Sequence, residues 1–277
     1  MPWHQNIPYI LEHLFQQIAQ LCQQYDVPLV EDISQAIGAH HSQRPLGTFG
    51  CASFYSASLT KYVDAYNGAF VITNCSLIHS KLADIASNEF LPPSHKRIKA
   101  IIFKTLIWNI ALSLKFFSVF TYPALFLLKY FKPATFERLL GPSISPQLAN
   151  KLPDFYFEDI SIIQCNSLVN QLKKLPRLLS LRKECVDIMS RTPLARSCNY
   201  SSSGNQVYWQ LICQVEDVAS ARGILFQYGI ETGTTNLPDL AALFGEYLPQ
   251  ARKLKRVSLF IPLHPSLGER YYQNIFF

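Results

Sequence analysis

Two residues in the first quarter of the chain could do chemistry together. Asp32 directly follows the apolar run "VPLV", and Lys61 lies further along among Ser, Thr, Ala and aromatic residues. A carboxylate at the end of a buried strand is partly desolvated and needs a cationic or hydrogen-bonding partner. A lysine amine with few charges nearby loses its proton more easily and becomes a nucleophile.

An acid and an amine are also the minimal pair that pyridoxal phosphate requires. The amine holds the cofactor, and the acid keeps the ring nitrogen protonated so that the ring accepts electrons. The spacing alone carries little information. Asp32 could equally be a strand or helix cap, and Lys61 a solvated loop lysine, so both interpretations stay open on these residues alone.

The surrounding pattern predicts the elements that position this pair. Residues 9–25 have helical spacing, "VPLVED" is typical of a short buried strand, and "CASFYSAS" and "GAFVITN" predict two more strands. A helix followed by an apolar strand favours an α/β sheet with parallel strands. Ligands of such sheets bind at the carboxyl ends of the strands, and Asp32 stands at such an end.

The second half of the chain predicts a smaller α+β unit. We expect a helix over 166–189, bent or split at Pro176, and a strand at "QVYWQLICQV". A helix should follow from Asp217 to a stop at Gly229, and then a last strand at "RVSLFIPLHP".

Composition bounds the class of protein. The chain has 277 residues, 49% hydrophobic and only 16% charged, with a net charge of +6. This favours extensive burial or contact with lipid, and the mild positive charge suits an anionic surface or phosphorylated substrates rather than nucleic acid. The seven cysteines form no C-x-x-C pair, which predicts reduced thiols and no metal site. The amino terminus has no signal-peptide pattern.

Residues 30–74 resemble the core signature of the DegT/DnrJ/EryC1/StrS family of sugar aminotransferases. The family pattern joins an acid in "EDAAQA", a G-x-x-G turn, "FSF-x-x-x-K" and "GEGG" before a "VVTND" strand. Here the matching segments are "EDISQA", "LGTFG", "YSASLTK" and "YNGAFVITN". The segments "QLKKLPRLLSLRKE", "FQYGIETG" and "IPLHPSL" resemble later family motifs more loosely.

The resemblance implies a fold-type-I enzyme that uses pyridoxal 5'-phosphate. Lys61 would form the Schiff base and move protons, and Asp32 would pair with the pyridinium nitrogen. Gln35 would lie against the hydroxyl side of the ring, and Ser56 would bind the phosphate. A family dehydratase is disfavoured, because those relatives carry His at the position of Lys61.

The chain departs from the family pattern in three places. The long segment that precedes the first helix in the family is absent, "FEDISI" replaces the Asn- and Arg-bearing "GYNYRM", and "YNGA" replaces "GEGG". A phosphate held only by Ser56 and its neighbours would lack donors. We therefore expect an amino-terminally truncated relative that binds the cofactor weakly on its own.

Residues 97–132, here called the insert, are not part of the family pattern. The longest uncharged runs, Thr105–Leu114 and Phe116–Leu128, are shorter than the about 18–20 residues that a membrane span needs. Arg97, Lys104 and Lys115 would share one helical stripe, and Pro123 should break the helix. The pattern indicates helices that lie at a bilayer interface, with core or dimer packing as the alternative and a true span disfavoured.

These observations lead to one main expectation. The expected fold class is α/β, an incomplete fold-type-I transferase with a partial mixed or parallel sheet at 1–96, the apolar helical insert and a loop at 97–155, and a small α+β domain at 156–277. The function is transfer of an amine from an amino acid to a nucleotide-linked keto-sugar for surface polysaccharide. The alternative is a non-catalytic, membrane-associated remnant or partner subunit. A cytoplasmic homodimer, or a pair with a full-length homologue, is expected, with attachment to the inner face of the membrane left open.

Overall fold

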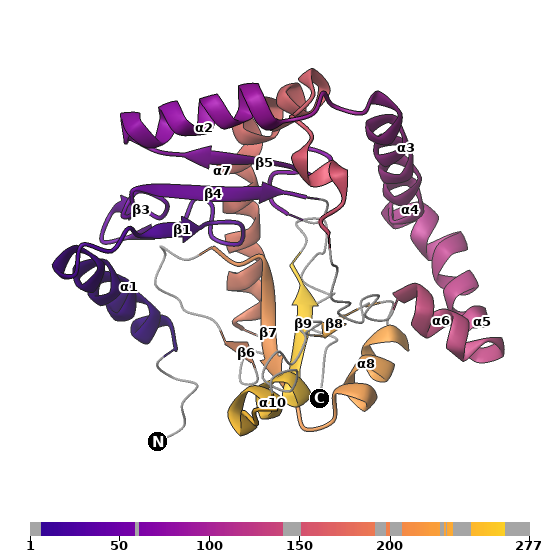
Figure 1. The fold of residues 1–277 in the computed structure, drawn as a ribbon. Coiled ribbons are helices and arrows are strands. Elements are labelled where there is room, and N and C mark those ends of the chain that lie inside the picture. Colours follow the sequence, from indigo (N-terminus) through magenta and orange to yellow (C-terminus); the bar gives the residue numbers. More distant parts are fainter. Residues whose placement is uncertain are drawn as a thin grey trace.

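The computed structural model describes residues 7–58, 61–140, 151–191, 198–199, 207–227, 230, 232–234 and 245–263. Two sheets lie one above the other in the view of Figure 1, and the long helix α7 passes behind both. Helices α3 to α5 follow one another down one side of the molecule (Figure 1). The architecture is mixed α/β, as the sequence predicts.

The upper sheet has the order β1-β4-β5, with β1 and β4 parallel and β4 and β5 antiparallel. Its elements and their neighbours are α1 (Ile7–Gln24), β1 (Val30–Asp32), β2 (His40–His41), β3 (Arg44–Pro45), β4 (Ala52–Ala57), β5 (Gly68–Ile72) and α2 (Ser76–Glu89). The predicted first helix and the three predicted strands are confirmed. The sheet is mixed rather than wholly parallel, because β5 follows β4 through a local connection that reverses the chain.

The insert is helical, with a different interruption from the predicted one. It comprises α3 (His95–Ala111), α4 (Leu114–Phe116), the π-helical turn η2 (Phe117–Thr121) and α5 (Tyr122–Phe131), with α6 (Pro133–Leu140) after it. Pro123 does not end the helix, which continues from η2 through the first turn of α5. The α-helical run is interrupted at Leu112 and Ser113, and again by the π-helical turn η2 directly before α5.

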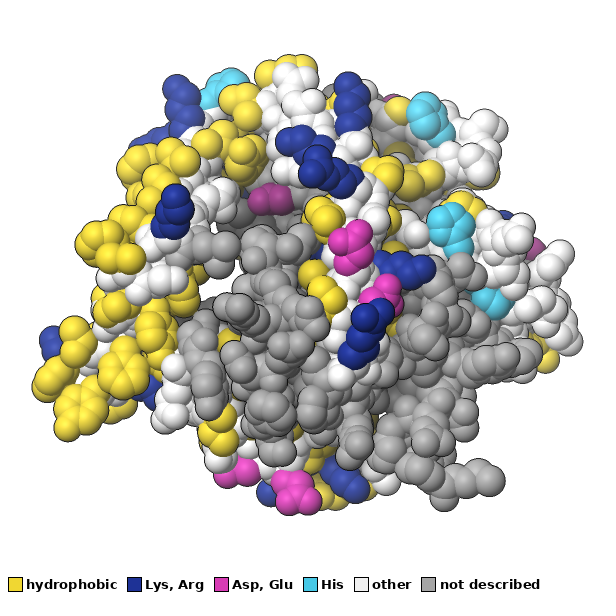
Figure 2. Space-filling model, turned by 180° about the vertical axis from the view of Figure 1, so that it is seen from behind, with side chains coloured by type: hydrophobic (Ala, Val, Ile, Leu, Met, Phe, Trp, Pro, Cys, Tyr) yellow, Lys and Arg dark blue, Asp and Glu magenta, His cyan; other side chains and the backbone are white. Residues whose placement is uncertain are grey.

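Hydrophobic side chains gather over the side of the molecule that α3 to α5 form, on the left in Figure 2. Within the described residues, no helix is both long and apolar enough to cross a membrane.

Helix α7 (Ile162–Met189) connects the two sheets. It begins with a capping box, in which the Ser161 hydroxyl accepts from the Gln164 amide and the Gln164 side chain accepts from the Ser161 amide. Helix α7 runs unbroken through Pro176, so of the two predicted effects of this proline the split does not occur. Its middle part packs on the upper core through Leu175, Leu178 and Leu179, and its last turns lie in the lower core. This packing offsets the backbone hydrogen bond lost at the proline.

The lower sheet has the order β6-β7-β9-β8 and is antiparallel throughout. Its elements are β6 (Cys198–Asn199), β7 (Gln210–Gln214), α8 (Val218–Gln227), β8 (Gly233–Thr234), α10 (Pro249–Val257) and β9 (Ser258–Pro262), and a short 3-10 turn, η3 (Asp154–Phe157), precedes α7. Asp217 caps α8 by accepting hydrogen bonds from the amides of Ala219 and Ser220. Gly229, the predicted helix stop, lies outside the described residues.

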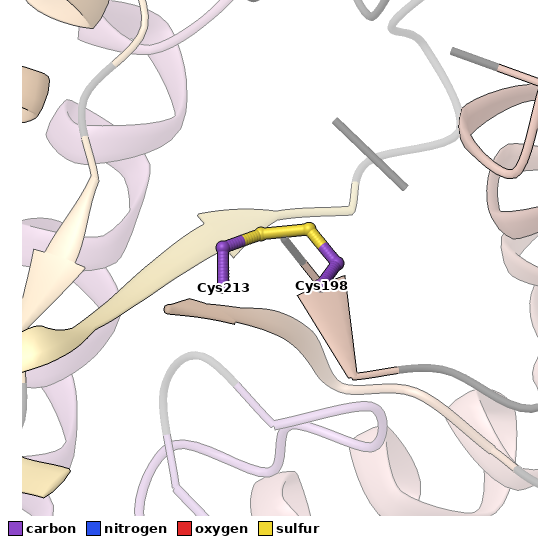
Figure 3. The surroundings of a disulfide bond; sticks show 2 residues. All are labelled: Cys198 and Cys213. Atoms are coloured by element: carbon purple, nitrogen blue, oxygen red, sulfur yellow. A yellow bond between two sulfur atoms is a disulfide. The ribbon is translucent and has the colours of Figure 1, made fainter. Parts of the chain in front are cut away.

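One cysteine pair overturns the expectation of reduced thiols throughout. Cys198 and Cys213 face each other across β6 and β7 and form a disulfide bond (Figure 3). Spacing along the chain gave no sign of this pair, because strand pairing brings the two residues together. The free thiols among the described residues are Cys22, Cys51, Cys75, Cys165 and Cys185.

Candidate active site

Asp32 occupies the predicted position at a strand end. It is the last residue of β1 and pairs with Phe54 of the parallel strand β4. The carboxyl ends of β1 and β4 therefore meet at the same edge of the sheet. The Asp32 side chain is exposed, and its Oδ1 accepts a hydrogen bond from the Ser34 amide at 2.9 Å. This bond fixes the orientation of the carboxylate while leaving its second oxygen accessible.

Ser34 connects Asp32 to Ser56. The buried Ser34 hydroxyl accepts a hydrogen bond from the Ser56 amide at 3.0 Å, so the segment after β1 is attached to the end of β4. Ser56 is half-buried, and its hydroxyl makes no hydrogen bond to another described residue. Gln35 is exposed in the turn after β1. Sequence reasoning missed Ser34, although its place in "EDISQA" two residues after the acid is typical of such a turn.

Lys61 belongs to a turn that closes back on the end of β4. Its amide donates to the Ser58 carbonyl at 3.1 Å, and the Ala65 amide donates to the Ala57 carbonyl at 2.9 Å. The Val63 amide donates to the buried Tyr55 hydroxyl at 2.8 Å, which holds the turn against the strand. Lys61 is therefore placed at the same sheet edge as Asp32 and Ser56.

An aromatic residue from the second half of the chain contacts Lys61. The Lys61 amine lies 4.4 Å from the centre of the Trp209 ring. Arg182 of α7 donates to the Trp209 carbonyl at 2.9 Å, and its guanidinium lies 4.7 Å from the centre of the Tyr62 ring. Burial raises the pKa of the Tyr62 hydroxyl, and the nearby positive charge of Arg182 partly offsets this.

Sequence reasoning missed Trp209 and Arg182 because only the fold brings Trp209 to the lysine and Arg182 to Trp209. The aromatic pair Tyr208–Trp209 just ahead of β7 is the one local signal that could have drawn attention to this segment.

Glu31, the neighbour of Asp32, has a structural role that the sequence did not reveal. Its side chain points to the opposite side of the strand and is buried. The carboxylate accepts hydrogen bonds from the amides of Gly47 at 2.6 Å, Phe49 at 2.6 Å and Gly50 at 2.7 Å. The G-x-x-G turn is thus held by one acid. The two adjacent carboxylates therefore differ in role: Glu31 fixes the turn, and Asp32 faces the candidate site.

The turn that replaces "GEGG" has the backbone that glycine favours. Tyr66 and Asn67 have φ values of 54° and 68°, in the left-handed region. The Asp64 carboxylate accepts a hydrogen bond from the Tyr66 amide at 2.8 Å, which supports the conformation. Tyr66 and Asn67 therefore adopt left-handed backbone conformations although neither is glycine.

These side chains supply some of the groups that binding of pyridoxal phosphate requires. Asp32, Ser56 and Lys61 lie at or just after the carboxyl ends of the neighbouring strands β1 and β4, and they offer a carboxylate, a hydroxyl and an amine. The Ser56 amide is already bonded to Ser34, so Ser56 offers a phosphate its hydroxyl but not its backbone N–H. A carboxylate and an amine are the groups that the ring nitrogen and the covalent attachment require, and further phosphate donors would have to come from outside the residues described.

Residues 13–100 match the sequence profile of the DegT/DnrJ/EryC1/StrS aminotransferase family. The L-glutamine:2-deoxy-scyllo-inosose aminotransferase of Micromonospora echinospora is 33% identical over 70 residues, which is 23% of this chain and 17% of that protein. The UDP-4-amino-4,6-dideoxy-N-acetyl-beta-L-altrosamine transaminase of Helicobacter pylori is 28% identical over 74 residues, which is 27% of this chain and 20% of that protein.

Solved structures share the fold over most of this chain. Helicobacter pylori PseC, an aminotransferase of pseudoaminic acid biosynthesis, superposes with a TM-score of 0.61 at 18% identity, covering 94% of this chain and 60% of PseC. The E. coli GDP-4-keto-6-deoxy-D-mannose-3-dehydratase with bound hydrated PLP gives 0.59 at 14% identity, covering 94% of this chain and 63% of that enzyme.

The chain thus spans about 60% of the length of the solved structures that it matches. The dehydratase structure holds PLP, and the fold shared with both neighbours confirms the expected fold class. The predicted resemblance is confirmed: residues 13–100 match the sequence profile of the DegT/DnrJ/EryC1/StrS aminotransferase family, and the chain shares its fold with a solved aminotransferase, PseC.

Proposed function

We propose that this chain carries the lysine-bearing part of a pyridoxal-phosphate-dependent sugar aminotransferase. Its reaction would move an amine from an amino acid to a nucleotide-linked keto-sugar, in the synthesis of surface polysaccharide. The carrying observation is that Asp32, Ser56 and Lys61 all lie at or just after the carboxyl ends of the neighbouring strands β1 and β4. The relatives support the substrate class, because one of them is named for a UDP-linked amino sugar.

Each residue has a role that its surroundings allow. When bound, pyridoxal phosphate supplies an electron sink next to the amino nitrogen. Lys61 would attach the cofactor through Nζ and move a proton at that atom. Asp32, oriented by the Ser34 amide, would accept a hydrogen bond from the ring nitrogen, and the Ser56 hydroxyl would donate to the phosphate. Gln35 would lie beside the ring hydroxyl.

A second candidate is a non-catalytic subunit that pairs with a longer homologue or with a second copy. The phosphate position favours it, because the Ser56 amide is committed to Ser34 and one hydroxyl is a weak site for a dianion. A partner chain would then have to contribute the missing donors. The two candidates differ in whether this chain binds cofactor and turns over substrate by itself.

Covalent labelling tests the site directly. The purified chain is incubated with pyridoxal phosphate and reduced with borohydride, and modified lysines are mapped by peptide mass spectrometry. We expect labelling to concentrate on Lys61 and to be lost in Lys61→Arg. The matched control is Lys173→Arg, because Lys173 is exposed on α7 away from the sheet edge. Equal labelling of surface lysines, unchanged in Lys61→Arg, would refute the assignment.

Turnover then separates the two candidates. With glutamate and a nucleotide-linked keto-sugar, the chain alone should bind the cofactor weakly and transaminate slowly. If labelling of Lys61 succeeds and turnover appears only after a longer homologue is added, the chain is a partner subunit. Tight, stoichiometric cofactor binding with full turnover by the chain alone would contradict the expected shortage of phosphate donors.

A further inference from the structure

The insert leaves a large apolar surface uncovered. Helix α3 buries only Ile98 and Thr105, and α5 buries no residue. Six of the side chains that remain more than half exposed are Phe103, Leu106, Val119, Phe120, Tyr130 and Phe131. Monomeric soluble proteins rarely expose a contiguous apolar patch of this kind, and such a patch marks an interaction site.

The way in which the insert is attached to the rest of the protein explains why its apolar surface stays exposed. The Tyr122 hydroxyl donates to the Gln227 carbonyl at 2.9 Å, and its ring centre lies 5.5 Å from that of Phe226 of α8. At the other end, Arg97 pairs with Glu158 ahead of α7. These contacts hold the insert against the body at its two ends. The core-packing interpretation requires the apolar side chains to be covered, and within the described structure they are not.

The charged residues in the sequence of the insert and its flanks are all basic. Between Phe90 and Phe136 the sequence has seven basic residues and no acidic one, whereas the rest of the chain has eighteen basic and nineteen acidic residues. The net positive charge of the protein therefore resides in the insert and its flanks. Arg97 is bound to Glu158, and Lys129 lies 4.7 Å from the centre of the Phe226 ring. Five exposed lysines remain for a partner: Lys96, Lys99, Lys104, Lys115 and Lys132.

Exposed aromatic and aliphatic side chains among lysines, without carboxylates, match the chemistry of an anionic bilayer surface. The apolar side chains would enter the boundary between headgroups and acyl chains, and the lysines would contact lipid phosphates and carboxylates. A second copy of the chain fits less well, because two such surfaces would bring like charges together. We propose that the exposed surface of α3, α4 and α5 binds anionic membranes without crossing them.

Flotation with vesicles tests this on the full chain. Phosphatidylcholine vesicles with and without phosphatidylserine are compared at low and high salt. We expect the protein to float with vesicles that contain phosphatidylserine. Flotation should be weaker at high salt and with vesicles that lack phosphatidylserine. The charge variant is Lys99→Gln/Lys104→Gln/Lys115→Gln, and the matched control is Lys173→Gln/Lys174→Gln/Lys183→Gln on exposed positions of α7, which lowers the net charge equally. The charge variant should bind on the order of 100-fold more weakly, and the control like the wild type.

A second variant, Phe103→Ser/Phe131→Ser, removes two apolar contacts at exposed positions where folding should be unaffected. It should also lose flotation, with an unchanged circular dichroism spectrum. The proposal is overturned if the wild type does not float with phosphatidylserine, or if both lysine triples weaken binding equally. Lipid-independent self-association that Phe103→Ser/Phe131→Ser abolishes, without flotation of the wild type, would assign the surface to a second copy instead.

Discussion

The amine of Lys61 lies 4.4 Å from the centre of the Trp209 indole ring, although the two residues belong to opposite halves of the chain. Arg182 holds the Trp209 backbone from α7 through its carbonyl. The candidate catalytic lysine is therefore positioned by the lower half of the molecule as well as by its own turn. Any change that loosens α7 or the approach to β7 should alter the surroundings of this amine.

The contact between Lys61 and Trp209 should be measurable as a coupling energy. A double-mutant cycle with Lys61→Met and Trp209→Leu, followed by urea unfolding, should give a coupling of about 0.5–1 kcal/mol. Trp209→Phe keeps an aromatic face and should retain part of the coupling. If the two substitutions change the free energy of unfolding additively, the ring does not hold the lysine in solution.

Two adjacent carboxylates should differ sharply in their effect on stability. Glu31→Gln replaces one oxygen of a buried acceptor of three backbone hydrogen bonds by an N–H donor, and should cost about 2–3 kcal/mol in the free energy of unfolding. Asp32→Asn changes an exposed side chain that accepts one amide, and should cost less than about 1 kcal/mol. Urea denaturation of both variants checks this, and equal losses would contradict the assignment of roles.

The Cys198–Cys213 bond should stabilise the lower sheet. The residues it joins are 15 apart in sequence. Cross-linking a loop of that length destabilises the unfolded chain by about 3 kcal/mol. The oxidised protein should therefore unfold at a higher urea concentration than the reduced protein. Cys198→Ala/Cys213→Ala should not respond to reductant. Alkylation of these two cysteines without prior reduction, detected by mass spectrometry, would argue against the bond.

The pair between Arg97 and Glu158 predicts a dependence of stability on pH. The hydrogen bond from the Ser94 amide and then the contact with Arg97 lower the pKa of Glu158 from its ordinary value of 4.5. Because the folded pKa is the lower one, the contribution is present above 4.5 and is lost as the pH falls through the folded value. Glu158→Gln should be less stable than the wild type near neutral pH, and the difference should shrink in acid.

A matched variant gives the baseline for this comparison. Asp154 forms an exposed pair with Lys151, with side chains 78% and 85% exposed, so Asp154→Asn should change stability little at any pH. A Glu158→Gln difference that stays constant with pH would show that the charge is not the cause.

The sequence by itself determined the elements of the upper sheet and where the two proposed reactive residues lie on them. Asp32 ends β1 and Lys61 follows β4, the parallel strands whose ends meet at one edge. The hydrophobic alternation that forms each strand is local, and so are the signals that end it, which is why this part could be predicted. The division into three domains, at 1–96, 97–155 and 156–277, stays a prediction.

The tertiary structure decided what depends on contacts between distant segments. Nothing near Glu31 in sequence shows that it binds the turn at Gly47–Gly50, and nothing near Lys61 indicates Trp209. Cys198 and Cys213 became a pair through strand register, and Pro176 stayed within one helix because both of its flanks are packed. Each outcome results from burial and hydrogen bonding between segments far apart in the chain, and these energies outweigh the local preferences that a sequence displays.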